Sequence, residues 1–176
     1  DDRPDDPRRV TVLKLSGDAY EALSRYDEAT TADQESLSLA QARDDGTGVV
    51  SALNGLANVA LKRGDLDTAQ AHYDAVITRV TKLAASDQHA DALTGLGTIA
   101  ARRGQIEVAR GYYDRSLALR REINDQKGIA ASLNNLGIIA RYQGDLPRAI
   151  EYFNEALSLR RAIGDRRGVA ATLSNL

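Results

Sequence analysis

The sequence repeats itself with a period of 40 residues, and no other feature limits the possible folds as strongly. Segments 116–136 and 156–176 are identical at 12 of 21 aligned positions. Self-similarity at a fixed period in this range is typical of repeat proteins, in which each small unit buries its apolar face against its neighbours. The chain is therefore predicted to be an array of one supersecondary unit.

A glycine followed by a polar residue marks a turn inside each unit. The pairs recur every 40 residues, as Gly64-Asp65, Gly104-Gln105 and Gly144-Asp145. Glycine tolerates the left-handed backbone in which many helices end, and aspartate caps the free N–H groups of the next helix. A second turn, between units, is predicted at Asn124-Asp125 and Gly164-Asp165.

Apolar residues between these turns recur at spacings of three and four, which is the pattern of amphipathic helices. The prediction is an all-α chain without strands. Its helices are expected at residues 8–23, 26–43, 48–63, 66–84, 88–103, 106–123, 128–143, 146–163 and 168–176. Glycine inside a helix costs about 1 kcal/mol relative to alanine. Gly97 and Gly137 are therefore expected where paired helices approach closely.

Composition excludes several classes of function. A net charge of −2 and a pI of about 5.7 provide no positive field for nucleic acid or for an anionic membrane. There is no cysteine, and therefore no disulfide or thiolate metal site, and there is no apolar run near 18 residues. These features predict a soluble, cytoplasmic protein with neither nucleic acid nor membrane as a partner.

The first residues predict that the chain is a piece of a longer protein. The sequence contains no methionine, and residues 1–7 are acidic, hold two prolines and lack apolar side chains. Such a segment cannot contribute to a core, so we expect a disordered lead-in at 1–7 and a repeat domain over 8–176.

Taken together, the leucine, small-residue, alanine and aromatic positions resemble the tetratricopeptide repeat. The 40-residue period resembles its long-helix form, as in Pins/LGN-type scaffolds, kinesin light chains and bacterial signalling proteins. The resemblance implies a right-handed α-solenoid of antiparallel helix pairs. Its units would be 8–47, 48–87, 88–127 and 128–167, with a partial fifth first helix at 168–176.

Two places depart from the family pattern. In the first unit Ser16 replaces a leucine and Asp33 replaces the aromatic residue of the second helix. A degenerate unit suits the end of an array, where one face has no neighbour. At the second junction, residues 84–87 read Ala-Ala-Ser-Asp and lack the glycine or asparagine signal.

The resemblance further implies a concave surface, lined by the first helix of each pair, that binds a protein or an extended peptide. The positions expected to face it are Ser51, Asn54, Asn58, Lys62, Asp91, Thr94, Thr98, Arg102, Asn134, Ile138, Arg141 and Tyr142. In the first unit, Lys14 and Asp18 occupy such positions. Asparagine offers both a donor and an acceptor, so Asn54 and Asn134 can hold a peptide backbone. Simple solvation of a helix face explains the same polar pattern.

No catalytic or metal-binding constellation is found in the sequence. Residues 95–100 read Gly-Leu-Gly-Thr-Ile-Ala, a dinucleotide-binding pattern, but they fall inside a predicted helix instead of after a strand. His72 and His89 are isolated, and a metal needs three or four converging ligands. We therefore expect no enzyme activity, no metal and no cofactor.

The arginine pairs at 120–121 and 160–161 recur near the ends of second helices. A cation there stabilises the helix dipole, by roughly 0.3–1 kcal/mol. A site for an anionic partner is the alternative.

The expected function is a non-enzymatic binding module whose concave face takes a peptide or a partner helix. One alternative is a structural element that associates end to end through its solenoid ends, since an uncovered end presents apolar residues. Another is the sensor part of a larger nucleotide-dependent signalling regulator.

Overall fold

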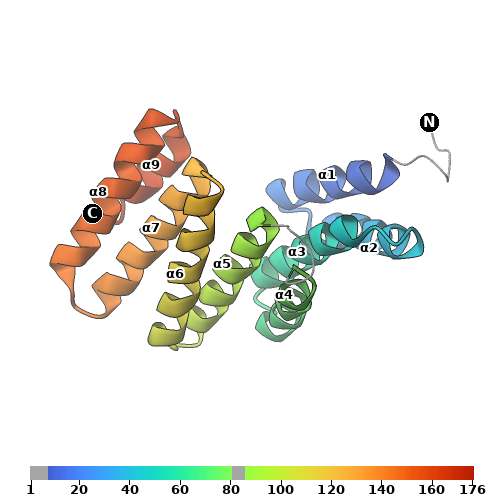
Figure 1. Ribbon diagram of the computed structural model, residues 1–176, viewed down its shortest axis with the longest axis horizontal. Coiled ribbons are helices and arrows are strands. Elements are labelled where there is room, and N and C mark those ends of the chain that lie inside the picture. The colour runs from blue at the N-terminus through green and yellow to red at the C-terminus, as the bar shows by residue number, and fades with distance from the viewer. Residues whose placement is uncertain (1–7, 81–85) are drawn as a thin grey trace. The chain divides into compact units, whose positions relative to one another are not determined.

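The computed structural model describes residues 8–80 and 86–176, which form nine α-helices and contain no strand (Figure 1). The helices are α1 (Arg9–Ala22), α2 (Tyr26–Ala42), α3 (Gly46–Arg63), α4 (Leu66–Val80), α5 (Ser86–Arg102), α6 (Ile106–Glu122), α7 (Gln126–Tyr142), α8 (Leu146–Ala162) and α9 (Arg166–Leu173). The all-α prediction is confirmed for these residues. The expected lead-in at 1–7 and residues 84 and 85 of the second junction lie outside them.

After the first pair, the first helix of each pair begins earlier than the apolar pattern predicts. Asp45, Asp125 and Asp165 are themselves the N-caps, and the Oδ1 atom of each accepts a hydrogen bond from the backbone N–H three residues on, at 2.9 Å. The helix therefore starts at the very next residue. For α3, α7 and α9 this is two residues before the predicted start.

The turns lie where the glycine pattern predicts them. Gly64, Gly104 and Gly144 have φ angles of 84°, 74° and 80°, in the left-handed region that glycine tolerates best. Between units, Asn124 and Gly164 adopt the same conformation, with φ angles of 56° and 72°. Asparagine and glycine thus meet one backbone requirement, which explains why the junctions differ in sequence.

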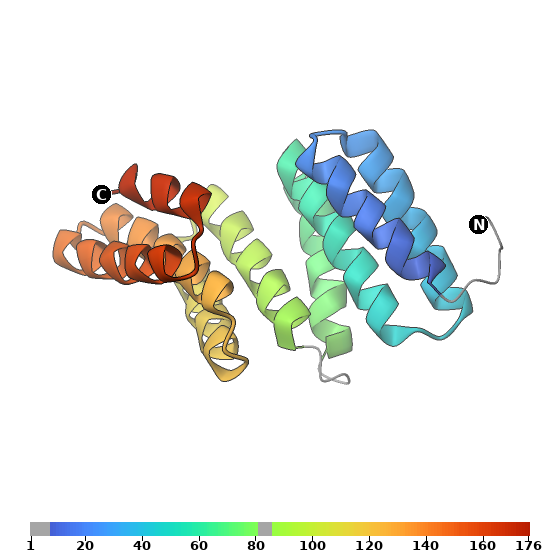
Figure 2. The ribbon, with the colours of Figure 1, turned by 90° about the horizontal axis from the view of Figure 1, so that it is seen from above.

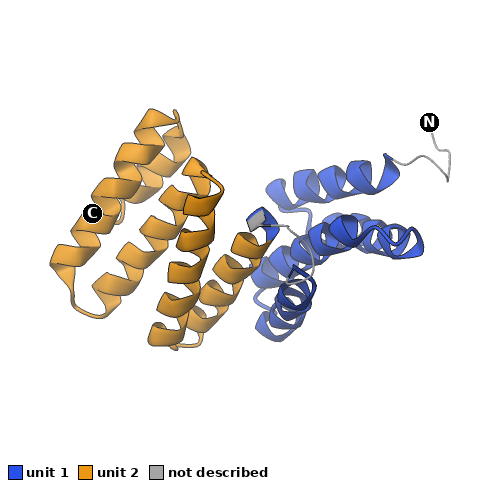
Figure 3. Ribbon diagram, viewed as in Figure 1, with its two compact units in different colours: residues 1–88 blue, residues 89–176 orange. Residues whose placement is uncertain are grey.

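The chain forms two compact units, residues 1–88 and residues 89–176 (Figure 3). In unit 1, α2 packs against both α1 and α3, α3 packs against α4, and α1 also contacts α3 (Figure 2). Its core includes Val50, Leu53, Ala57, Tyr73 and Val76. Each helix of this unit thus contacts its sequence neighbours, as a helical repeat requires.

In unit 2, α7 packs against α6 and α8, and α9 packs against α8 (Figures 1 and 2). One core cluster includes Tyr113, Leu117, Leu133, Leu136 and Ile139. A second gathers Ala140 and Ala149 around Phe153.

Close helix approach explains the helical glycines of unit 2. A Cβ added to Gly97 would lie 2.7 Å from Cε1 of Tyr113, and one added to Gly137 would lie 2.5 Å from Cε1 of Phe153. Real Cβ atoms do not come so near a ring, so the predicted role of both glycines is confirmed.

None of the helices in the described residues has the length and apolar character needed to cross a bilayer.

Candidate peptide-binding surface

A groove of about 380 Å³ lies in unit 1 between α1 and α3, the first helices of its two pairs. Both helices therefore present one face to the same opening. The lining residues are Val10, Thr11, Lys14, Leu15, Asp18, Asp45, Thr47, Gly48, Ser51 and Gln88. Three of them, Lys14, Asp18 and Ser51, occupy positions that the family resemblance assigns to the binding face.

The charged side chains in and near this groove form ion pairs and are partly buried. Lys14 forms an ion pair with Asp18, and its Nζ lies 3.8 Å from Oδ1 of Asp33. Burial raises the pKa of Asp33 to about 7, against the opposing effect of Lys14. Burial also raises the pKa of Glu21, although Lys62 opposes it. The lining of the groove thus holds both signs of charge, in Lys14 and Asp18, which suits an oriented ligand.

Among the predicted residues of α3, two are open to solvent and two are engaged inside the protein. Ser51 is partly exposed in the groove and Lys62 is exposed. Asn54 is buried, and its Nδ2 donates to the carbonyl O of Gln88 at 3.0 Å. Asn58 Oδ1 accepts a hydrogen bond from the Tyr73 hydroxyl at 2.5 Å.

On α5, the two threonines take part in helix-to-helix contacts. Thr94 Oγ1 lies 2.9 Å from Oγ of Ser116 on α6, and Thr98 Oγ1 lies 3.2 Å from the Tyr113 hydroxyl. Asp91 is exposed and pairs with Arg120, with Oδ1 2.6 Å from Nη2. Arg102 is exposed at the end of the helix.

On α7, Asn134 is buried and its Oδ1 accepts a hydrogen bond from Nδ2 of Asn175 at 3.1 Å. Arg141 is exposed and its Nη1 donates to the carbonyl O of Asn175 at 3.0 Å. Tyr142 is exposed and Ile138 is partly buried.

The polar ladder of Asn54, Thr94 and Asn134 is therefore tied into the fold. Its role as a holder of peptide backbone stays a prediction, and that role requires the present hydrogen bonds to be exchanged for new ones. The predicted residues that are exposed are Lys62, Asp91, Arg102, Arg141 and Tyr142, although Asp91 and Arg141 also make contacts within the chain.

Sequence reasoning missed part of the groove and part of the arginine chemistry. Val10, Thr11 and Thr47 line the groove, but the degenerate first unit gave no register strong enough to select them. Arg120 is buried and forms ion pairs with Asp91 and Asp125. The recurrence of arginine at position 160, one period later, was the sequence feature that could have identified this arginine.

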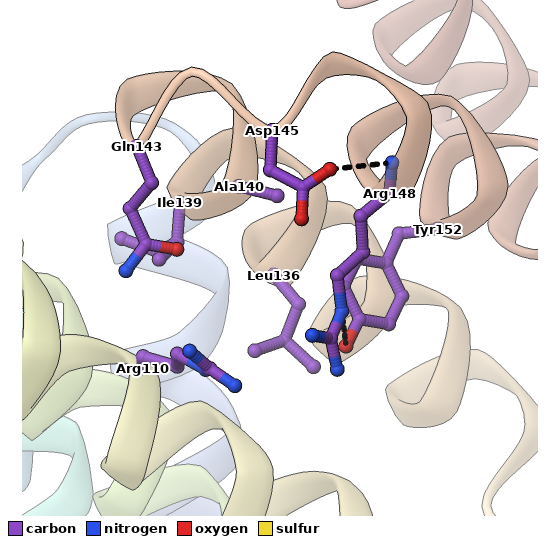
Figure 4. A pocket seen from close by; sticks show the side chains of 8 residues that line it. All are labelled: Arg110, Leu136, Ile139, Ala140, Gln143, Asp145, Arg148 and Tyr152. Atoms are coloured by element: carbon purple, nitrogen blue, oxygen red, sulfur yellow. Dashed lines mark hydrogen bonds between the residues drawn. The ribbon is translucent and has the colours of Figure 1, made fainter.

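A second hollow lies at the turn between α7 and α8, beside α6 (Figure 4). Arg110 faces it from α6, while Arg148 turns toward Tyr152, whose hydroxyl accepts a hydrogen bond from its Nε at 3.3 Å. Its volume is about 30 Å³, against about 380 Å³ for the groove between α1 and α3, so the groove is the better candidate for binding a peptide.

Within residues 8–80 and 86–176, no three side chains of His, Asp or Glu cluster in a way that could hold a metal ion. Burial lowers the pKa of both His72 and His89.

Comparison with known protein families identifies the same helical repeats. A tetratricopeptide repeat family model matches residues 48–122 and 124–176. A search of curated protein sequences finds no significant match.

Similar solved structures include BtubC (BKLC) from P. vanneervenii, at 20% identity and a TM-score of 0.73, with 96% of this chain and 80% of that chain covered. Aspartyl phosphate phosphatase F from Bacillus subtilis is 14% identical with a TM-score of 0.84, covering 98% of this chain and 44% of that one. A Rap protein complexed with Competence and Sporulation Factor is 14% identical with a TM-score of 0.83, covering 93% and 46%. The chain spans less than half the length of these last two proteins. At such identities the likeness shows the fold alone.

The predicted α-solenoid is confirmed by these neighbours and by the helix pairs of both units. The family match points to a protein-interaction scaffold of a non-catalytic kind. With the family model covering most of its length, the chain belongs to the tetratricopeptide repeat family.

Proposed function

We propose that the chain is a non-enzymatic scaffold that binds an extended peptide or a partner helix on its first helices, which are α1 and α3 in unit 1 and α5 and α7 in unit 2. The observation that carries this proposal is the groove between α1 and α3. A groove of this size accommodates several peptide side chains. One similar structure, the Rap protein, is complexed with a factor, which makes a peptide-like ligand a reasonable class to test.

The charged residues of this face are suited to orienting a ligand but contribute little to its affinity. In unit 1, apolar Val10 and Leu15 lie beside charged Lys14 and Asp18. Exposed ion pairs contribute only about 0–1 kcal/mol each, so apolar contacts and backbone hydrogen bonds would supply most of the affinity. We expect micromolar binding, on the order of −8 kcal/mol.

A matched pair of serine variants tests the groove. Peptides are selected from a random display library against the parent protein, and their affinities are measured by calorimetry. Ser51→Arg places a long cation inside the groove on α3, whereas Ser38→Arg makes the same change on an exposed position of α2.

We expect Ser51→Arg to weaken binding by about tenfold or more, which is about 1.4 kcal/mol, and Ser38→Arg to bind like the parent. Circular dichroism checks that both variants keep the parent's helix content. Normal binding by Ser51→Arg together with loss of binding in Ser38→Arg would refute the groove assignment.

A second candidate function is self-association through α9. Leu173 and Leu176 are large apolar residues exposed at this end of unit 2. Exposed apolar patches mark interaction surfaces.

A further inference from the structure

One lysine in the groove between α1 and α3 lies within reach of two carboxylates. Lys14 and Asp18 both line the groove and form an ion pair along α1. The Nζ atom of the same lysine lies 3.8 Å from Oδ1 of Asp33 on α2. The groove thus contains a cation that is shared between an exposed acid of its lining and a buried acid.

The buried acid is held in the fold without a hydrogen bond to its Oδ1 atom. Asp33 is 1% exposed and lies against Gly17 of α1 and Gly55 of α3, the two helices that flank the groove. Within residues 8–80 and 86–176 its Oδ1 has no hydrogen-bond partner, because 3.8 Å is too long for such a bond. A buried carboxylate oxygen without a donor is costly, and a closer approach of Lys14 would stabilise it.

The exposed acid is open to a ligand. The side chain of Asp18 is 53% exposed, against 16% for that of Lys14. The two residues lie four positions apart on one helix, and an exposed ion pair of this kind contributes little to stability. Replacement of Lys14 by another cation on Asp18 therefore costs little free energy.

Several acids lie close together around Lys14. Burial raises the pKa of Asp33, and Asp18 and Glu21 raise it further, against the opposing effect of Lys14. On α3, Lys62 lowers the pKa of Glu21, which burial raises. Like charges at this distance disfavour one another, so an additional cation beside them is favourable.

The apolar part of the lining suits the stem of a long cationic side chain. Val10 and Leu15 line the groove together with Asp18, and Leu15 is 61% exposed. Lysine and arginine lay their methylene groups along apolar surface and carry the charge at the tip. The volume of about 380 Å³ is in the range of pockets that hold small ligands.

We propose that Asp18 is the anionic partner of a lysine or arginine side chain of the ligand, in the groove of unit 1. On binding, the ligand cation takes the place of Lys14 on Asp18, and Lys14 moves onto Oδ1 of Asp33. The buried carboxylate thereby gains the hydrogen bond that it lacks in the free protein. That a peptide supplies the cation rests on the proposed function, whereas the subsite itself can be tested with small cations.

Blocked amino acids serve as probes, and the side-chain carboxyl ¹³C resonances of Asp18 and Asp33 report on the two acids. N-acetyl-lysine methylamide and N-acetyl-arginine methylamide carry the cation. N-acetyl-norleucine methylamide has the lysine stem without its charge, and N-acetyl-glutamate methylamide has the opposite charge. All four are titrated at constant ionic strength and at about pH 8, above the pKa of about 7 that burial gives Asp33.

A matched pair of aspartate variants tests the partner of the ligand cation. In the parent we expect saturable shifts of both carboxyl resonances with the two cationic probes and none with the other two. Asp18→Asn should weaken binding at least about tenfold. Asp74→Asn makes the same change at an exposed position on α4, outside the groove, and should bind like the parent.

Two further variants test the movement of Lys14. Asp33→Asn removes its second carboxylate, so Lys14 stays on Asp18 and the cationic probes should bind about fivefold more weakly. Lys14→Met removes the internal competitor and should tighten binding by about the same factor. In Lys14→Met the Asp33 resonance should no longer respond to the probes, because no lysine moves onto it.

Saturation that depends on Asp18 supports the subsite, and the tighter of the two cationic probes identifies the side chain that it prefers. A linear shift without saturation in the parent would overturn the proposal, as would saturation by the glutamate probe or equal binding by the parent and Asp18→Asn. Unchanged binding in both Asp33→Asn and Lys14→Met would overturn the movement of Lys14. Because no peptide is present, failure of this titration leaves the proposed function standing. Failure of the Ser51→Arg test would likewise leave the subsite standing.

Discussion

A buried carboxylate occupies the place where the second helix of each later pair has an aromatic ring. Asp33 is 1% exposed, and its Oδ1 has no hydrogen-bond partner among the described residues. Two glycines make room for it, because a Cβ on Gly17 would lie 2.7 Å from Oδ1 and one on Gly55 would lie 2.3 Å from Oδ2. The first pair therefore keeps the repeat backbone without the usual apolar contact.

This carboxylate makes stability depend on pH. Burial raises the folded-state pKa of Asp33 to about 7, above its unfolded value of about 3.9, so the folded protein binds the proton more tightly. Its contribution to stability is therefore full below about pH 4 and is lost as the pH rises through about 7.

We predict that Asp33→Asn removes this slope and raises the free energy of unfolding at about pH 8 by about 1–2 kcal/mol, since an amide has no charge to desolvate. The measurement is urea unfolding at several pH values. The other charged groups that act on Asp33 remain in the variant as a constant background: Lys14, Asp18 and Glu21 on α1. The idea fails if Asp33→Asn keeps the parent's pH slope.

Gly137 tests the close helix approach in unit 2. Gly137→Val should lower the free energy of unfolding by about 1–3 kcal/mol, because Phe153 is buried and cannot move away from the new side chain. Gly111 on α6 is the matched control, since nothing lies within 4 Å of its Cβ position. Gly111→Val should change stability by less than about 0.5 kcal/mol. Equal changes in thermal stability for the two variants would show that packing against Phe153 is not the reason for glycine at position 137.

Repetition in the sequence made the structural roles of some residues predictable but not those of others. Gly97 and Gly137 could be assigned because a small residue recurs at the same helical position one period apart. The fate of Asn54 could not, because the sequence does not show that its amide donates to the Gln88 carbonyl.

At the scale of the helix, one aspartate serves two elements. Asp125 caps α7 through the Gly128 N–H and also accepts a hydrogen bond from Arg120. Burial would raise the pKa of Asp125, but the bonds from Gly128 and Arg120 outweigh it and hold the pKa below its usual value. Asp145 also caps its helix, through the Arg148 N–H at 3.1 Å, but is exposed.

The two caps should therefore differ in importance. Asp145→Ala removes only a cap and should cost about 1 kcal/mol. Asp125→Ala also leaves Arg120 with one carboxylate fewer, and should cost about 2–3 kcal/mol. Denaturant unfolding of the two variants measures this difference, and equal losses would mean that the Arg120 pair contributes nothing.

The number and order of helices and the starts of the second helices followed from the sequence pattern, whereas the starts of the first helices did not. Apolar spacing identifies the buried face of a helix. This signal is present only where the helix packs against another helix. The first turn of α7 is exposed at Gln126 and Lys127, so it has no apolar signal and was predicted to lie outside the helix. The capping role of Asp125 was the better guide to the boundary.

At the scale of the whole molecule, the exposed Leu173 at the end of α9 and Leu176 just after it predict self-association. Sedimentation velocity should show an average mass that rises with protein concentration. Leu173→Glu should abolish this rise, whereas Ile150→Glu, at an equally exposed apolar position on α8, should not. A constant monomer mass at high concentration would rule out association through α9.

The central claim is that ligands bind the face of the first helices, and mapping of amide chemical shifts tests it most directly. A peptide selected against the parent protein is added to the isotope-labelled chain until saturation. The account predicts that the largest shifts fall in α1, α3, α5 and α7, with Ser51 or Tyr142 among the affected residues. Shifts confined to α2, α4, α6 and α8 would contradict it.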